Sequence, residues 1–403
     1  MNRRHLLAGF AALSAAPLFP RIAFASEGLP DAAGASNALG FDLFRAASAE
    51  PNLFVSPFSI ASALAMTLAG ARGRTEQQMR MVMHLQGSRR AVGEAFQTEI
   101  QSVRDRAKAE GYQLAVANQL FGEKTLRFEA PFLEHVAKHY GAPLEAVNFA
   151  GSHDAARKQI NAWVTDKTNQ RIKDLLLPTD VTRLTRLVLT NAIWFKGSWQ
   201  KAFDPKLTRT GQFHLAGGKA PTDAEFMRQK SRFQVAQFRE GSMIALPYGK
   251  GGARMLVVLP NENQPAGLMS GTIDAKTLSG WRDKLRHRTV DLKLPKFTVG
   301  SRFDLSKKLS DLGMTDAFKD AADFSGMSKA DLRIDKVIHK TFVTVGEEGT
   351  EAAAATAVVM GRKGASQPQP PVTFHADRPF LYFIEDTRRD ALLFAGRLDN
   401  PTR

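Results

Sequence analysis

Apolar residues in the first half of the chain recur at spacings of three and four positions, the period of amphipathic helices. In the segment SPFSIASALAMTLAGA, small and apolar residues are almost continuous after the helix-start signal of Ser56 and Pro57. We therefore expect that helix to be buried on most of its faces. The expected helices cover residues 35–48, 59–71, 89–110, 131–140 and 153–169.

Short apolar runs follow in the second half of the chain and predict strands. The clearest runs are RLVLTNAIWF, ARMLVVLP, TVDLKLPKF and KTFVTV. The chain ends in PFLYFIEDTRRDALLFAGRL, which predicts two strands around a polar turn at Asp386 to Asp390. Because helices come first and strands follow, the pattern favours an α+β architecture over alternating βαβ units.

The first 25 residues have the pattern of an export signal. Two arginines precede an apolar stretch that ends at Leu18, and Ala23 and Ala25 suit a signal peptidase; a short amphipathic helix of the mature protein is the alternative. The paired arginines resemble a twin-arginine signal, which would mean a bacterial protein exported after folding, and an ordinary secretory signal is the other choice. We expect a periplasmic or extracellular protein, because no other apolar run is long enough to cross a bilayer.

Composition makes this a foldable chain without cysteine chemistry. Its 403 residues are 43% apolar and 24% charged, and no linker rich in proline, glycine, serine or charge divides them, so we expect a single domain over residues 26–403. The absence of cysteine excludes disulfides and a cysteine nucleophile. The formal charge of +15 falls to about +12 without the three signal arginines, which favours polyanionic partners.

Two patterns suggest metal or catalytic chemistry and are incomplete. His135 and His139 have the spacing of a metal-binding pair on a helix, but no third ligand or HExxH motif is near, so we expect solvated helix surface and no metal. Ser198 to Lys201 matches the SxxK pattern of penicillin-binding enzymes, but the SDN and KTG elements are missing and the segment reads as a turn after a strand. The sequence indicates no enzyme and no cofactor.

Basic side chains gather in two segments, as a solvated charged face or as a site for a heparin-like polyanion. The first set, on or near one helix, is Arg89, Arg90, Arg104, Arg106 and Lys108. The second set is Arg286, Arg288, Lys293 and Lys296.

Several of these segments together resemble the serpin family, from about Ala35 to Arg403. The matching segments, in family order, are NLFVSPFSIASALAM (52–66), LVLTNAIWFKGSW (187–199), LKLPKF (292–297), GMTDAF (313–318), ADFSGM (322–327), VIHKTFVTVGEEGTEAAAAT (337–356) and FHADRPFLYFI (374–384). The resemblance implies the serpin fold, with three β-sheets, eight or nine helices and an exposed reactive-centre loop at about residues 347–373.

In that frame, the stretch EEGTEAAAATAVVM is a strand waiting for a sheet. Its loop hinge comprises Glu347, Gly349, Thr350, Ala352, Ala354 and Thr356, and the last four fall on one face by alternation. Gly349 provides the backbone freedom that the turn needs. An alanine-rich helix is the alternative, but it explains the alanines and not their order with the threonines. Before cleavage we expect Thr350 to lie in or beside an exposed loop.

The resemblance implies inhibition by covalent suicide trapping. A serine protease attacks the bait carbonyl and forms an acyl-enzyme, and the cut loop then inserts into the large sheet and distorts the protease. Each new backbone hydrogen bond contributes about 1 kcal/mol net, and ordering each residue costs about 1 to 2 kcal/mol. The driving force must therefore come from a native fold that is unfavourable before insertion.

Residues that match family positions controlling sheet opening are Ser56, Ser59, Asn191 and His339, a buried polar cluster, together with Trp199 and the ion pair of Lys296 with Glu347. A buried histidine is also commonly just a satisfied core group.

The bait bond is placed by family spacing between Lys363 and Gly364, with Arg362 as the alternative bait residue. Counting back from Phe374 points nearer Ala365. A basic bait residue suits the acidic pocket of a trypsin-like protease, so we expect a protease of that class as the partner. We also expect the inhibitor to be a monomer. The alternatives are a non-inhibitory serpin acting as a carrier or polyanion-binding protein, and an exported hydrolase. The small residues of the hinge favour inhibition.

Overall fold

The computed structural model describes residues 28–48, 51–262, 264–350 and 370–402. The α-helices in these residues are α1 (Ala32–Ala46), α2 (Pro57–Leu68), α3 (Gly73–Val82), α4 (Arg89–Glu110), α5 (Ala130–Tyr140), α6 (Phe149–Lys167), α7 (Ala266–Thr272), α8 (Ala275–Arg282) and α9 (Ser306–Asp311). The five helices expected from sequence are confirmed within a few residues at their ends.

Helix α2 is buried at every position, as its composition predicts. It begins where the Ser56 hydroxyl accepts a hydrogen bond from the Ser59 amide, and Pro57 occupies the first turn, where its missing N–H costs nothing. Helix α4 begins in the same way at Ser88 and ends at Gly111, whose φ of 79° is left-handed.

The strands are β1 (Phe54–Val55), β2 (Gln113–Glu123), β3 (Glu145–Val147), β4 (Leu187–Ser198), β5 (Arg209–Phe213), β6 (Thr222–Phe238), β7 (Gly241–Tyr248), β8 (Ala253–Pro260), β9 (Arg286–Pro295), β10 (Phe297–Asp304), β11 (Lys336–Gly346), β12 (Gly349–Thr350), β13 (Val372–His375), β14 (Phe380–Asp386) and β15 (Ala391–Leu398). One sheet has the order β10-β11-β12-β4-β2-β3, and the other has the order β1-β15-β14-β8-β7-β6-β9-β13, with β5 beside β6.

The expected third sheet is present as one arm of the larger sheet, because the long strand β6 belongs to both arms. Its residues Gln234–Phe238 pair with β7, whereas Phe226–Val235 pair with β9 and Thr222–Phe226 pair with β5. The expected α+β architecture is thus confirmed.

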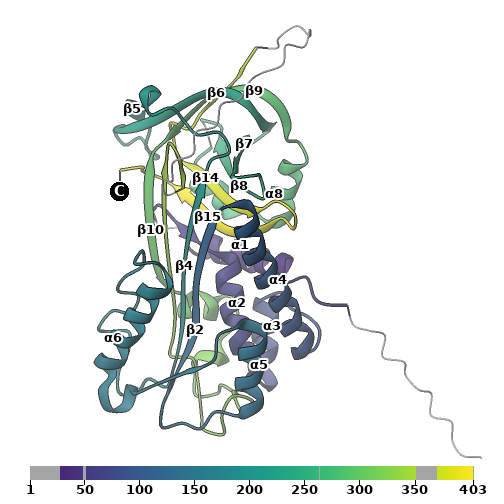
Figure 1. Cartoon of the computed structure of the whole chain (residues 1–403), viewed down its shortest axis with the longest axis vertical. Coiled ribbons are helices and arrows are strands. Elements are labelled where there is room, and N and C mark those ends of the chain that lie inside the picture. The colour runs from purple at the N-terminus through teal and green to yellow at the C-terminus, as the bar shows by residue number, and fades with distance from the viewer. Residues whose placement is uncertain (1–27, 49–50, 263, 351–369, 403) are drawn as a thin grey trace, which may run out of the picture.

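The six-stranded sheet runs along the molecule, with α6 on one face and the group of α2, α4 and α5 on the other (Figure 1). Side chains from α6, β2 and β4 form a small core on the first face. Larger cores lie beneath α1 and α2 and between the two sheets. No helix in the described part of the chain is long and apolar enough to span a membrane.

Candidate functional site

The short strand β12 lies between β11 and β4 at one end of the six-stranded sheet. Thr350 pairs with Val345 on one side and with Gly197 on the other, in antiparallel register on both sides. Farther along, β11 and β4 pair directly and in parallel, from Lys336 opposite Val188 to Phe342 opposite Trp194. The sheet is therefore already parted at one end and closed over the rest of its length.

Gly349 has to be glycine in this arrangement. Its φ is 151°, a region that side chains disfavour, and a Cβ atom would lie 2.1 Å from the carbonyl oxygen of Gly197. The backbone freedom expected of this residue is thus required by a close approach to β4.

Thr350 is fully buried, so the expectation that it lies in or beside an exposed loop was wrong. The turn at Glu347 and Glu348 returns the chain into the sheet before Thr350 is reached. The Thr350 hydroxyl then forms a hydrogen bond of 2.6 Å with the Tyr248 hydroxyl. The other hinge residues, Ala352, Ala354 and Thr356, and the bait residues Arg362, Lys363 and Gly364 lie outside the described residues.

Trp199 anchors the turn before β12. Its indole Nε1 donates to the Gly346 carbonyl at 2.9 Å, its backbone N–H donates to the Glu348 carbonyl at 2.9 Å, and its ring stacks on Tyr248 with centroids 4.5 Å apart. Trp199 thus lies at the end of the sheet where β12 begins.

Lys296 and Glu347 form the predicted ion pair, with Nζ and Oε1 3.4 Å apart. Glu225 is a second partner of Lys296 at 3.2 Å, which sequence reasoning missed. Burial by itself would raise the pKa of Glu347, but hydrogen bonds from its own backbone N–H and from Thr208, with the charge of Lys296, outweigh burial and lower it. This carboxylate is thus held ionised at the start of the hinge.

The four polar residues expected behind the middle of the sheet do form one buried cluster, because Ser56, Ser59, Asn191 and His339 have no exposed surface. The Ser56 backbone N–H donates to His339 Nε2 at 3.1 Å, and the Asn191 amide donates to the Ser59 hydroxyl at 2.8 Å. Sequence reasoning missed Asn118 of β2, which accepts hydrogen bonds from Ser59 and Asn191 at 2.9 and 2.7 Å. An asparagine in a mostly apolar strand was the available signal.

His339 is a neutral imidazole in this cluster. Because Nε2 accepts from Ser56, Nδ1 carries the proton and donates to Asn191 Oδ1. Burial lowers the pKa of His339 to about 3. The bond between His339 and Asn191 links β11 to β4 where the two strands pair directly.

The first basic set does not form one patch. Arg106 is buried and forms an ion pair with the fully buried Asp386, so its place on a solvated or polyanion-binding face was wrong. Arg89 is paired with Glu76 at 2.5 Å and Arg90 with Glu94 at 2.8 Å. Arg104 and Lys108 remain exposed near the end of α4.

In the second basic set, Lys293 lies over the Phe226 ring at 4.0 Å and is 3.8 Å from Asp377, while Lys296 belongs to the hinge. Only Arg286 and Arg288 of this set are left for the expected surface, at the start of β9.

The two histidines of α5 are packed and not solvated, which corrects their expected place on helix surface. Their rings lie 4.6 Å apart, and His139 is hydrogen-bonded to Gln97 at 2.9 Å. Gly93 of α4 leaves the space, because a Cβ there would lie 2.7 Å from His135. Burial, with His139 and Lys138 nearby, lowers the pKa of His135 to about 4. Within the described ranges, no group of three or more ligand side chains could hold a metal.

The SxxK segment has no catalytic arrangement. Ser198 ends β4 and does not begin a helix. The Lys201 amine donates to the Ser231 hydroxyl at 3.0 Å and to the Arg232 carbonyl at 3.3 Å.

Comparisons with known proteins identify the family of this chain. The family described as "Serpin (serine protease inhibitor)" matches residues 34–401. The chain is 40% identical over 379 residues to the leukocyte elastase inhibitor of Sus scrofa, covering 91% of this chain and 98% of that protein. The chain therefore belongs to the serpin family, and this relative is named as a protease inhibitor and not as an enzyme.

Two solved structures show the range of activities among similar folds. Human thyroxine-binding globulin, solved in complex with thyroxine, has a TM-score of 0.83 and 28% identity, and the match covers 92% of this chain and 99% of that one. Native protease nexin-1 with heparin has a TM-score of 0.82 and 30% identity, with the same coverage. Nothing in these comparisons supports a bacterial origin or export, which stay predictions.

Proposed function

We propose that this serpin inhibits serine proteases by covalent trapping coupled to insertion of its reactive-centre loop. The observation that carries the proposal is β12, whose described residues Gly349 and Thr350 lie antiparallel between β11 and β4. The loop enters the sheet there, so insertion needs only to extend a strand that has already begun.

The register of β12 says which residues would meet during insertion. Extending the pairing of Thr350 with Val345 and Gly197 brings Thr356 opposite both His339 and Asn191. The same extension brings Met360 opposite Leu187, the first residue of β4. The stretch from Thr350 to Met360 thus has the length of the strands that would receive it.

The exchange of hydrogen bonds offsets part of the entropic cost of insertion but does not by itself drive it. The parallel pairing of β11 with β4 would be lost and two antiparallel ladders would form, so the number of backbone hydrogen bonds rises. At about 1 kcal/mol net per bond, this gain offsets part of the roughly 1 to 2 kcal/mol per residue of ordering. The bond between His339 and Asn191 must also give way, which makes the buried cluster a barrier to premature opening.

The target we propose is a trypsin-like protease, because Lys363 stands at the family's bait position and Arg362 precedes it. Incubation with trypsin should give a complex that survives a denaturing gel, and mass spectrometry of the released C-terminal peptide should find Gly364 or Lys363 at its start. A peptide that begins after Met360 would contradict the trypsin assignment and indicate a chymotrypsin-like or elastase-like target.

The alternative is a non-inhibitory carrier, and the fold similarity to thyroxine-binding globulin supports it. The protease panel separates the two, because a carrier would be cleaved or ignored without a covalent complex.

We also propose that the mature domain begins near residue 26 and is exported as a monomer, on the strength of the N-terminal signal pattern. N-terminal sequencing and sedimentation of the secreted protein test this, and an intact N-terminus in a cytosolic fraction would contradict it.

A further inference from the structure

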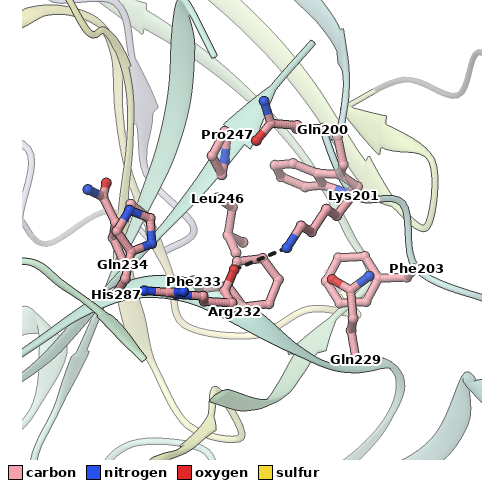
Figure 2. A pocket seen from close by; sticks show the side chains of 12 residues that line it. Gln200, Lys201, Phe203, Gln229, Arg232, Phe233, Gln234, Leu246, Pro247 and His287 are labelled. Atoms are coloured by element: carbon pink, nitrogen blue, oxygen red, sulfur yellow. Dashed lines mark hydrogen bonds between the residues drawn. The ribbon is translucent and has the colours of Figure 1, made fainter. Parts of the chain in front are cut away.

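A cavity of about 420 Å³ lies beside the hinge and has no role in the trapping mechanism. Its walls come from β6, β7, the second residue of β9 and the segment Trp199 to Phe203 that follows β4 (Figure 2). Ligand pockets for small organic molecules usually have volumes of about 300 to 1,000 Å³. The cavity therefore has the size of a small-molecule site.

One side of the cavity is aromatic. Trp199, Phe203 and Phe233 line it with little exposed surface of their own, and Leu246 lies among them. Rings of this kind provide a large apolar contact area for the body of a ligand.

The polar side of the cavity is basic. Lys201, Arg232 and His287 line it, and none of the lining residues is acidic. Figure 2 shows the Lys201 amine reaching into the cavity, where its hydrogen bonds go to neutral oxygens of Ser231 and Arg232. Among the residues that the structure describes, neither Lys201 nor Arg232 forms an ion pair with a carboxylate.

Gln229 adds an unused acceptor. Its amide nitrogen donates to the Ala202 carbonyl at 2.8 Å, whereas its buried Oε1 has no hydrogen-bond partner in the described part of the chain. A buried acceptor without a partner is costly unless a ligand or water supplies a donor.

We propose that this cavity binds an amphipathic organic anion, with its apolar body against Trp199, Phe203 and Phe233 and a single carboxylate or sulfonate at the Lys201 amine. A charge-assisted hydrogen bond to an ammonium group is about twice as strong as a neutral one, so Lys201 should contribute much of the affinity.

The same wall of the cavity holds the hinge. Trp199 donates to the carbonyls of Glu348 and Gly346, both at 2.9 Å, and the Phe203 N–H donates to the Glu347 carbonyl at 2.8 Å. A ligand packed on these two rings stabilises the turn before β12 in its native position. This coupling rests on the proposed function and predicts that the ligand slows loop insertion, because it binds the native arrangement better.

Binding is tested first without any protease. 8-Anilinonaphthalene-1-sulfonate should show saturable fluorescence enhancement with the full-length protein, and decanoate should displace it. Lys201→Met should weaken the probe's affinity about tenfold. The matched control is Lys206→Met, which removes the same charge from an exposed position that does not line the cavity. Absence of saturable binding, or equal affinities in the two variants, would overturn the site.

Coupling is tested with a trypsin-like protease and saturating decanoate. The share of protease ending in covalent complex should fall several-fold for the wild type and remain unchanged for Lys201→Met. If the probe binds through Lys201 but decanoate leaves that share unchanged, the coupling is wrong and the site stands. If no complex forms even without decanoate, the proposed function fails, while the titration still decides the binding site.

Discussion

His339 lies where β11 and β4 would separate, and both of its ring nitrogens are bonded to neutral groups. Its Nε2 accepts from the Ser56 N–H, and its Nδ1 donates to Asn191. Its pKa in the folded protein, about 3, lies below the value of about 6.5 expected in the unfolded chain. The unfolded chain therefore takes up this proton at a higher pH than the folded one. The contribution to stability is complete above about pH 6.5 and is lost as the pH falls toward 3.

His339→Gln should remove this dependence on pH. Between pH 6.5 and pH 5, the wild type should lose roughly 2 kcal/mol of unfolding free energy through this group, and the variant should lose correspondingly less. Urea unfolding at both pH values measures it. His214→Gln, at an exposed position, is the control and should behave as the wild type. Identical pH profiles for His339→Gln and the wild type would show that the imidazole is not held neutral.

A substitution of Thr350 tests whether β12 belongs to the native sheet. Because it is fully buried and bonded to Tyr248, Thr350→Arg should force β12 out of the sheet and lower native stability as well as abolish the covalent complex. The variant should be cleaved as a substrate.

Thr350→Ser is the matched control, since it keeps the hydroxyl, and it should retain both melting temperature and trapping. Thermal unfolding and a denaturing gel measure the two properties. A Thr350→Arg variant with wild-type stability and trapping would mean that β12 is not part of the native sheet.

At the scale of elements, sequence patterns predicted the long pieces and missed those that depend on tertiary contacts. The five expected helices have an apolar stripe or a continuous apolar run, whereas α3 reads GRTEQQMRMV and buries only Thr75, Gln78, Met79 and Val82. Strand β12 could not be predicted, because its described residues, Gly349 and Thr350, carry no periodicity and only their place between β11 and β4 makes them a strand. The burial of Arg106 could not be predicted either, because its partner Asp386 is 280 positions away in the sequence and only the fold brings the two together.

Three basic side chains of α4 are exposed to solvent: Arg90, Arg104 and Lys108. Arg104 and Lys108 follow Arg90 by 14 and 18 positions, so the three residues share one face of the helix. From Arg90 to Lys108 this face is about 27 Å long. Heparin should accelerate inhibition at low salt and lose that effect at high salt. Arg104→Ser with Lys108→Ser should raise the half-effective heparin concentration several-fold.

Lys319→Ser with Lys329→Ser removes the same charge from exposed positions elsewhere and should leave that concentration unchanged. Inhibition kinetics over a heparin series measure both double variants. If heparin does not alter the inhibition rate at low salt, the basic residues of α4 do not bind a polyanion and are ordinary charged surface.

At the scale of the whole molecule, the native six-stranded sheet has β12 between β11 and β4 at one end, and those two strands pair directly over the rest of their length. Extending β12 between them adds a central strand whose length matches its neighbours, so the cleaved protein should be the more stable form. We expect its melting temperature to exceed that of the intact protein by at least about 15 °C, the scale reached otherwise by combining many stabilising substitutions.

The register makes this gain depend on particular positions. In the inserted strand Thr356 falls opposite His339 and Asn191, both fully buried beneath α2. Thr356→Trp should therefore stop insertion part-way, because overpacking a closed core costs roughly 1 to 3 kcal/mol or more and displaces the strand. The cleaved variant should gain far less melting temperature than the cleaved wild type.

Gly361→Trp is the matched control, because the same register places residue 361 beyond the first residues of β4 and β11. It introduces an equal bulk just past the ends of the receiving strands, so the cleaved control should keep the full gain. Calorimetry of the intact and cleaved forms of all three proteins measures the differences. Equal gains for Thr356→Trp and Gly361→Trp would mean that the loop does not continue β12 in this register, and the insertion mechanism would have to be replaced.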